Sequence, residues 1–281
     1  MSESKQRRYD WVTFTSDYGL DDVFVGVCKG VVAQLAPHVR ILDVCHLIAA
    51  QDVEQGANSL AAAIPYLPVA VHLALVDPMH GSSARGIAVE TTDSSMLVGP
   101  DNGLLSLAWN ERGGVARACE ITNPKLWRET VHKTFRGRDV FAPVAAHLAN
   151  GGDFFDIGPA IPADSLTRIP VRSVVVDDDH VHAEVSLVDH FGNVSLNLAR
   201  SDLEAAGISF GDTVELRCNG RTLAVPFTAT YGDVPRGRLT LCEDSFRAVM
   251  LAVNAGHASQ ELRITRGEPV VIARLPQQAS R

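Results

Sequence analysis

The chain has 281 residues, of which 46% are hydrophobic and 21% charged, a normal composition for a folded protein of one large or two ordinary domains. Its 25 basic and 33 acidic residues give a formal net charge of -8, and no helix-length window concentrates lysine or arginine. These values argue against a nucleic-acid partner or an anionic membrane surface, and they favour a small-molecule partner.

Two further patterns bear on location. The five cysteines are far apart and never spaced as CxxC, which argues against a disulfide framework or a structural zinc site. The first ten residues are polar, and no later stretch approaches the ~20 apolar residues needed to cross a bilayer. We therefore expect a cytoplasmic protein with free thiols and no membrane partner.

The first half of the chain alternates strand and helix patterns. Apolar runs predict strands over residues 11–16, 39–44 and 71–76, and helical spacing predicts helices over residues 23–35 and 52–66. Later strand-like runs cover residues 87–90, 96–98 and 115–121, with helices over 104–109 and 139–148. This order predicts an α/β domain with a layered, largely parallel sheet.

The pattern changes after residue 162. Short β-rich runs separated by turns follow, including one at 262–265, and only residues 246–254 have helical spacing. We place the boundary near residue 170. The expected organisation is an α/β domain over residues 1–170 and a smaller β domain over residues 171–281.

Two acidic residues follow predicted strands of the first domain. Asp77 comes directly after the run at 71–76, and Asp17 directly after the run at 11–16. Open α/β sheets bind ligands at such strand ends, so both are candidate site residues. Asp17 could accept hydrogen bonds from a vicinal diol, or it could satisfy backbone amides at a helix start; residue type alone leaves both readings open.

Three other segments contain potentially reactive or ligand-binding residues. The segment from His80 to Gly86 resembles an anion-holding turn, but it lacks the lysine of a P-loop and the closing glycine of a GxSxG motif. Asp177 to His182 carries acids and histidines that could bind a metal, but a solvated hairpin tip explains them better, and we predict no metal site. Asp189 to Asn193 could be a purine pocket or an ordinary β turn.

Several segments taken together resemble the S-adenosylmethionine hydroxide adenosyltransferases, a family that also includes fluorinating and chlorinating enzymes. They occur in the family's order along nearly the whole chain: TSDYGLDD (15–22), DVEQGA (52–57), VDPMHG (76–81) followed by RGIAVE (85–90), VGPDNGLLS (98–106), TFRGRDVFAPVAAHLA (134–149), VDHFGNVSLN (188–197) and the segment at Asn254.

The resemblance implies an N-terminal α/β domain, a C-terminal β barrel and a homotrimer. Its active sites would lie at subunit interfaces, between the N-terminal domain of one chain and the C-terminal domain of its neighbour. It also implies the reaction, in which water or hydroxide attacks C5′ of S-adenosylmethionine and releases adenosine and methionine. S-adenosylmethionine is then the substrate, and no cofactor is expected.

The resemblance also assigns substrate-binding residues. Asp17 would hold the ribose diol, and Gln51 stands where halogenating relatives carry an aromatic residue against the ribose. The remaining residues lie in the matched motifs. Phe191 and Asn193 are expected at the adenine, Asp189 and Ser245 at the ammonium and carboxylate of methionine, and Asn102, Phe135 and Asn254 elsewhere around the substrate.

The catalytic residues depart from the family pattern. Hydrolytic relatives carry an Asp, Arg, His triad, but here the first arginine of a pair is Ala84, which leaves Arg85 as a catalytic candidate, and the histidine is replaced by Arg136. We hypothesise that Asp77, His80 and Arg136 rebuild the triad in permuted form. His80 would take or orient the water proton, and Arg136 would keep Asp77 ionised.

Three functions are therefore open from the sequence. The first is hydrolysis of S-adenosylmethionine. The second is halide-dependent adenosyl transfer. The resemblance of Gly137 to the chlorinating relatives favours it, and the acid at Asp77, which those relatives lack, disfavours it because a carboxylate repels a halide. The third is an adenosyl-ligand binding protein that has lost turnover.

Overall fold

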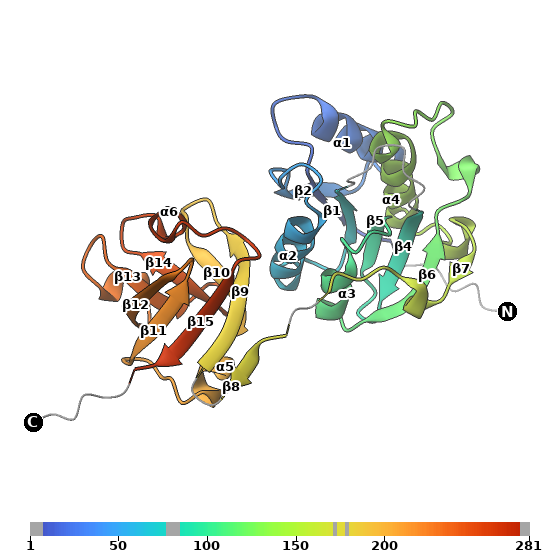
Figure 1. Ribbon diagram of the computed structural model, residues 1–281. Coiled ribbons are helices and arrows are strands. Elements are labelled where there is room, and N and C mark those ends of the chain that lie inside the picture. The colour runs from blue at the N-terminus through green and yellow to red at the C-terminus, as the bar shows by residue number, and fades with distance from the viewer. Residues whose placement is uncertain (1–7, 77–84, 171–172, 178–179, 276–281) are drawn as a thin grey trace, which may run out of the picture. The chain divides into compact units, whose positions relative to one another are not determined.

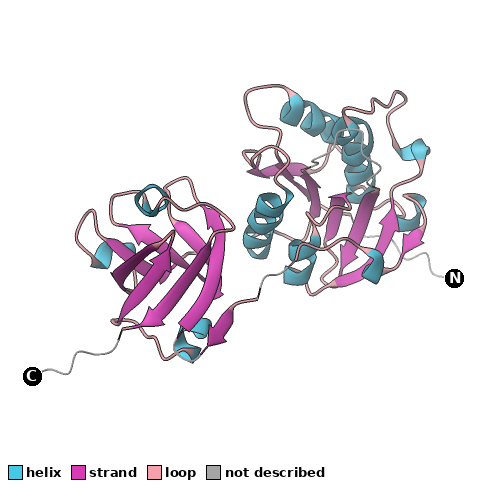
Figure 2. Ribbon diagram, viewed as in Figure 1, coloured by secondary structure: helices cyan, strands magenta, loops and turns pink. Residues whose placement is uncertain are grey.

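The computed structural model describes residues 8–76, 85–170, 173–177 and 180–275. The chain divides into two compact units, residues 1–170 and 171–281 (Figure 1). The first unit combines helices with a sheet, whereas the second consists mainly of strands (Figure 2).

The N-terminal unit is built on one seven-stranded sheet with the order β2-β1-β3-β5-β4-β6-β7. Strands β2, β1, β3 and β5 are parallel, while β4 runs antiparallel to β5 and β6, and β7 antiparallel to β6. The strands are β1 (Trp11–Ser16), β2 (Arg40–Cys45), β3 (Val71–Leu75), β4 (Gly86–Thr91), β5 (Met96–Pro100), β6 (Val115–Glu120) and β7 (Ala160–Ile161).

The sheet is therefore mixed, which corrects the expectation of a largely parallel one. A parallel pair needs a crossover of a dozen or more residues, but only residues 92–95 separate β4 from β5. In this tight turn the Asp93 carboxylate accepts the Ser95 amide at 2.9 Å and the Thr91 hydroxyl at 2.7 Å. The turn therefore makes β4 and β5 a hairpin.

Helices cover both faces of this sheet. On one face α1 (Phe24–Leu35) packs with α4 (Ala142–Ala149), and on the other α2 (Val53–Ala63) packs with α3 (Ser106–Glu111). The alternation of β3 shows the two cores, since Leu73 and Leu75 join the first and Ala74 joins the second. Short helical turns complete the chain: η1 (Ile64–Tyr66), η2 (Pro124–Leu126), η3 (Gly137–Phe141), η4 (Phe154–Asp156), η5 (Ala163–Ser165) and η6 (Tyr231–Asp233).

The C-terminal unit is a nearly closed antiparallel sheet with the order β12-β11-β15-β9-β10-β14-β13, and β8 also pairs with β9. A bridge between Phe227 and Leu241 brings its two ends together around a buried apolar core. Its elements are β8 (Val175–Asp177), β9 (His180–Val188), β10 (Val194–Ala199), α5 (Arg200–Ala205), β11 (Thr213–Cys218), β12 (Arg221–Pro226), β13 (Leu239–Glu243), β14 (Ala248–Val253), α6 (Ala258–Leu262) and β15 (Pro269–Arg274).

Two local predictions for this unit are wrong. The expected helix at 246–254 is strand β14, which lies between β10 and β13 and is buried on both faces, so its continuous apolar run carries no strand alternation. No strand forms at 262–265, and its expected first residue, Leu262, is the last residue of α6. Helix α5 was not expected, because six residues are too few to show a helical period.

The free cysteines agree with the expectation made from their spacing. All five cysteines are unpaired, and burial raises the pKa of Cys28 and Cys119 to about 12. These two thiols are therefore unreactive at neutral pH. Among the residues that the structure describes, no helix is both long and apolar enough to span a bilayer.

Candidate functional site

The strand order places a candidate ligand-binding edge at the carboxyl ends of β1 and β3. The chain runs from β1 to β2 on one side and then crosses to β3 on the other, and open α/β sheets bind ligands at such a reversal. Asp17 follows β1 here, and its amide donates to the Leu75 carbonyl, the last residue of β3, at 3.3 Å.

The Asp17 carboxylate is bonded to a distant part of the chain. It accepts the backbone amide of Gln51 at 2.8 Å, across 34 positions of sequence. Gln51 has φ 67°, in the left-handed region that side chains other than glycine rarely adopt. The structure therefore brings together Asp17 and Gln51, two of the predicted substrate-binding residues.

An aromatic cluster adjoins this edge. The ring centroids of Tyr18, Phe24 and Phe135 lie 5.1 to 6.0 Å apart, and these rings line a pocket together with Leu75 and Arg136. Gly137 follows Arg136, and a Cβ at this position would clash with the Tyr18 hydroxyl. Glycine therefore lets the Tyr18 side chain approach this turn closely, which is a structural role independent of any halide.

Asp139 anchors the segment that carries Phe135 and Arg136. Its fully buried carboxylate accepts the His132 amide at 2.8 Å and the Arg138 guanidinium at 2.6 and 2.8 Å. Burial alone would raise the pKa of Asp139, but these bonds hold it at about 2. The same segment enters α4 through a π-helical turn, a feature often found at functional sites.

Arg136 is the last residue before this π turn. Its guanidinium carbon lies 5.2 Å from the centroid of the Phe141 ring, and its Nη2 would lie 3.4 Å from a Cβ at Gly86. Gly86 is the first residue of β4. Arg136 therefore lies beside the residue that immediately follows Arg85, although the two arginines are 51 positions apart in sequence.

Arg85 and Asn102 bond to the framework of the unit. The Arg85 Nε donates to Asp101 at 2.7 Å, and its Nη2 donates to the Ser165 carbonyl at 2.7 Å. The Asn102 Nδ2 donates to the Val76 carbonyl at 2.8 Å, and its Oδ1 accepts the Leu104 amide at 3.1 Å. These contacts fix the positions of both side chains within the N-terminal unit.

Asp77 and His80, together with Ala84, lie outside the described residues. The geometry of the permuted triad is thus a hypothesis for these positions. Its third member, Arg136, is described, and so are the two residues that flank the segment, Val76 and Arg85.

The C-terminal unit has a pocket of its own, about 580 Å³ in volume. It is lined by residues between β9 and β10, between β13 and β14, and after β14. Four of the predicted substrate-binding residues are brought together here, namely Asp189, Phe191, Asn193 and Ser245.

The Asp189 turn displays an aromatic ring to solvent. The Asp189 Oδ1 accepts the amides of Phe191 and Asn193, both at 2.9 Å, and its Oδ2 accepts the Asn193 side-chain amide at 2.8 Å. Gly192 has φ 81°, which glycine adopts without strain. The turn leaves the Phe191 side chain in the open, with 73% of the residue exposed.

Asp244 organises the second side of the pocket. It accepts the amides of Phe246 and Ala248 at 2.8 and 2.9 Å, and it accepts the Ser195 hydroxyl at 2.8 Å. These bonds shape the loop that carries Ser245. Asn254, by contrast, uses its side chain to hold the Val234 carbonyl at 2.6 Å, while its neighbours Val253 and Ala255 line the pocket.

Sequence reasoning missed several pocket residues. Tyr231, Met250 and His257 line the C-terminal pocket, and Tyr18 and Phe24 line the N-terminal one. Tyr18 could have been found from its place next to Asp17. Met250 was hidden by the incorrect helix at 246–254, and no local signal marks Tyr231 or His257.

Comparison with family models covers both units. Residues 12–158 match the model described as the SAM hydroxide adenosyltransferase N-terminal domain, and residues 183–271 match the C-terminal domain of the same family.

Curated relatives and a solved structure agree with these matches. The (R)-S-adenosyl-L-methionine hydrolase of Salinispora tropica is 47% identical over 258 residues, 92% of this chain and 95% of the relative. That of Thermus thermophilus is 38% identical and covers 92% and 98%. A fluorinase of Nocardia brasiliensis is more distant, at 29% identity over 79% and 82%. An uncharacterized conserved protein from Thermotoga maritima superimposes with a TM-score of 0.88 at 34% identity, covering 94% of this chain and all of that one.

Proposed function

Because this chain belongs to the SAM hydroxide adenosyltransferase family, we propose as its function the hydrolysis of S-adenosylmethionine to adenosine and methionine. The observation that carries this conclusion is the 46 and 47% identity, over 92% of the chain, to two relatives named (R)-S-adenosyl-L-methionine hydrolase. The chain is thus an enzyme. Its substrate is a small molecule, in keeping with the composition.

The reaction needs a positioned water more than a strong acid. An oxygen of water forms a bond to C5′ while the C5′–S bond breaks, and the water releases one proton. The sulfonium loses its charge and leaves as the neutral thioether of methionine. Holding the water in line can supply up to roughly 7 to 11 kcal/mol of barrier reduction, so no metal or cofactor is required by this chemistry.

The N-terminal residues are proposed to bind the ribose and activate the water. The Asp17 carboxylate is suited to accept both hydroxyls of the ribose diol, and Gln51, whose amide bonds to it, would lie beside the sugar. Phe135 would contribute to the aromatic wall. Asp77, His80 and Arg136 are proposed as the permuted catalytic triad, with Arg85 and Asn102 supporting the segment that carries the first two.

The C-terminal residues are proposed to bind the two ends of the substrate. Phe191 would stack on adenine and Asn193 would read its edge, because a ring and an amide are matched to a purine. Asp189 and Ser245 would bind the ammonium and carboxylate of methionine, with Asn254 holding the adjacent loop.

We also propose that two chains form each active site. The C-terminal pocket displays Phe191, Tyr231 and Phe246 with more than half of each residue exposed, and Leu20 and Val23 near Asp17 are similarly exposed. Such apolar groups favour burial against another protein surface. The proposed assembly is a cytoplasmic homotrimer in which the C-terminal unit of a neighbour completes the N-terminal site.

The names of the relatives also specify a sulfonium configuration. They are (R)-S-adenosyl-L-methionine hydrolases, and we propose the same preference for this chain. Separate incubation with the two sulfonium epimers should show faster turnover of the R form.

Isotope labelling tests the reaction itself. Purified protein is incubated with S-adenosylmethionine in ¹⁸O-labelled water, with and without fluoride or chloride, and the products are analysed by mass spectrometry. We expect adenosine with the label at its 5′ oxygen, together with unlabelled methionine, at a rate independent of halide. A 5′-halogenated nucleoside would identify halide-dependent adenosyl transfer instead, and binding without turnover would identify a binding protein.

A further inference from the structure

A hydrogen-bonded chain of three side chains ends next to Asp17, and we call it the relay. The Ser16 hydroxyl lies 2.7 Å from Nδ1 of His46, and the His46 Nε2 lies 3.1 Å from the Asp43 carboxylate. Lys29 on α1 donates to the same carboxylate at 2.7 Å. Ser16 is fully buried and His46 is 4% exposed, so water does not compete for the bond between them.

The direction of these bonds follows from the chemistry of the carboxylate. Burial would raise the pKa of Asp43, but the bonds from Lys29 and His46 lower it below its usual value, so Asp43 is ionised and only accepts. Nε2 of His46 therefore donates to Asp43, and in the tautomer whose single ring proton is on Nε2, Nδ1 is an acceptor. The Ser16 hydroxyl then donates to Nδ1, and its lone pairs remain to accept the Tyr18 amide at 3.3 Å.

The order Ser, His, Asp is also that of a nucleophilic triad, but the surroundings exclude that role. A nucleophile must reach its substrate, whereas Ser16 has no exposed surface and its oxygen already accepts the Tyr18 amide. The His46 ring is covered by Phe14, with 4.7 Å between the ring centroids. The Ser16 and His46 side chains therefore have a structural role.

The structure held in place is the turn that carries Asp17. His46 bonds to Ser16 before Asp17, and its backbone carbonyl accepts the amide of Gly19 after it, at 2.8 Å. One residue at the end of β2 thus fixes both sides of Asp17 from outside the turn. Both bonds involve His46, whose own ring is oriented by Asp43.

We propose that Asp43, His46 and Ser16 are positioning residues that fix the Asp17 carboxylate for two-point binding of the ribose diol. The inference rests on the proposed function of Asp17. A carboxylate that is free to rotate would still bind one hydroxyl, but it would bind two at once less often. Loss of the relay should therefore reduce the preference for a ligand with both hydroxyls, while the protein remains folded.

The test compares the affinities of the full-length protein for adenosine and for 2′-deoxyadenosine, which lacks one hydroxyl of the diol. We expect Ser16→Ala and His46→Gln to lower the wild-type preference for adenosine about tenfold, the equivalent of one hydrogen bond to a charged group. Calorimetric titration measures both affinities, and thermal melting checks folding. His46→Asn, whose amide oxygen replaces Nδ1, should retain most of the preference.

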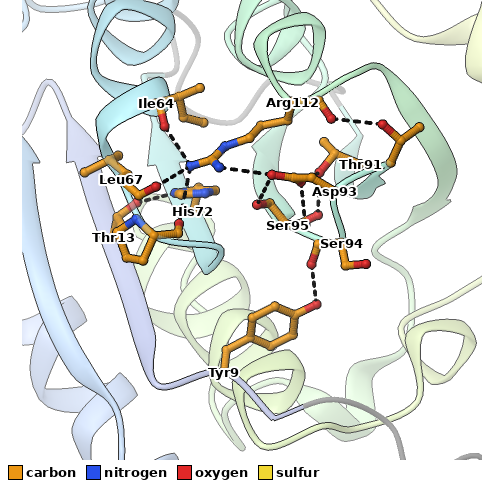
Figure 3. Close-up of polar contacts among 12 residues, drawn as sticks. Tyr9, Thr13, Ile64, Leu67, His72, Thr91, Asp93, Ser94, Ser95 and Arg112 are labelled. Atoms are coloured by element: carbon orange, nitrogen blue, oxygen red, sulfur yellow. Dashed lines mark hydrogen bonds and ion pairs between the residues drawn. The ribbon is translucent and has the colours of Figure 1, made fainter.

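Thr13 offers a matched control on the same strand. It lies three residues before Ser16, and its buried hydroxyl lies 2.8 Å from Nδ1 of the equally buried His72 (Figure 3). Thr13→Val should lower the melting temperature while leaving the preference for adenosine unchanged.

The outcomes separate this inference from the function on which it rests. A wild-type preference that Asp17→Ala abolishes but Ser16→Ala and His46→Gln retain would overturn the relay alone. A wild-type protein without any preference would overturn the ribose-binding role of Asp17 and the relay with it. An equal loss of preference in Thr13→Val would also overturn the relay, because the effect would then be a general consequence of core damage.

Discussion

Asp17 and Asp189 each follow a strand in a different unit, but they are held in opposite ways. The Asp189 carboxylate accepts amides of its own turn, two to four residues away. The Asp17 carboxylate accepts an amide from Gln51, and the Asp17 amide donates to the carbonyl of Leu75 in β3. The flanking residues Ser16 and Gly19 both bond to His46, which follows β2. The contacts of the Asp189 carboxylate are therefore local, whereas those of the Asp17 turn come mainly from residues brought close by the assembled sheet.

The largest effect is expected from removing the Asp17 side chain, the carboxylate that is held by distant parts of the chain. Asp17→Ala should lower kcat/KM for S-adenosylmethionine by about 10³-fold, since two hydrogen bonds to a charged acceptor are lost. Steady-state kinetics measures this effect, with Asp21→Ala on the same turn as the control. A loss no greater than that of the control would remove Asp17 from substrate binding.

The next prediction separates binding from chemistry in the N-terminal unit. His80→Ala should lower kcat by about 10²-fold with little change in substrate affinity, because a lost general base slows proton transfer without removing a binding contact. Single-turnover kinetics and calorimetric binding give the two quantities. Near-normal kcat would exclude His80 from the mechanism.

A third carboxylate, Asp139, adds a pH test to the comparison. Its pKa is about 2 in the folded protein and near 3.8 when unperturbed, so its stabilisation is fully present above the higher value and is lost as pH falls towards the lower. We expect about 2 kcal/mol of the acid-induced loss of unfolding free energy to come from this group. Urea denaturation between pH 5 and pH 2 measures it.

The control for this pH test is Asp139→Asn, which does not titrate. The variant should be less stable than the wild type at pH 5, and the difference between them should shrink towards pH 2. Parallel pH profiles of the two proteins would contradict the assignment.

The smallest expected effect concerns the locally closed turn. The Asn amide oxygen can accept the same backbone amides, so Asp189→Asn should keep the turn while removing the negative charge. Its NH2 group replaces the oxygen that accepts the Asn193 side-chain amide, so some adenosine affinity is lost as well. We expect about a tenfold rise in KM for S-adenosylmethionine and a smaller loss of affinity for adenosine, which has no ammonium group. A matched loss of adenosine affinity would show that the turn itself had changed.

The same difference explains what could be predicted from the sequence. The Asp189 turn, the β1 strand with Asp17 at its end and the alternation of strands and helices all follow from residues close together in the chain. The pairing of Asp17 with Gln51 does not, because it depends on how β1, β2 and β3 are ordered. Nor does the role of His46, since its partners Ser16 and Asp43 are identified only by the fold.

The errors have a similar origin. The antiparallel half of the first sheet was missed although both strands of the β4–β5 hairpin were expected, because strand patterns do not state direction. Strand β14 was mistaken for a helix because both its faces are buried. Arg85 was assigned by motif, and the structure adds its bonds to Asp101 and Ser165, which only tertiary geometry reveals.

Asp101 and Asn102 are adjacent in one turn, yet their side chains bond to the residues on either side of residues 77–84. Asp101 binds Arg85, and Asn102 binds the Val76 carbonyl. One dipeptide thus fixes both Val76 and Arg85. These two residues flank the segment that is proposed to carry the water-activating groups. The corresponding segment of a relative could therefore be inserted between these two residues without redesigning the sheet. They are natural boundaries for exchanging one nucleophile for another.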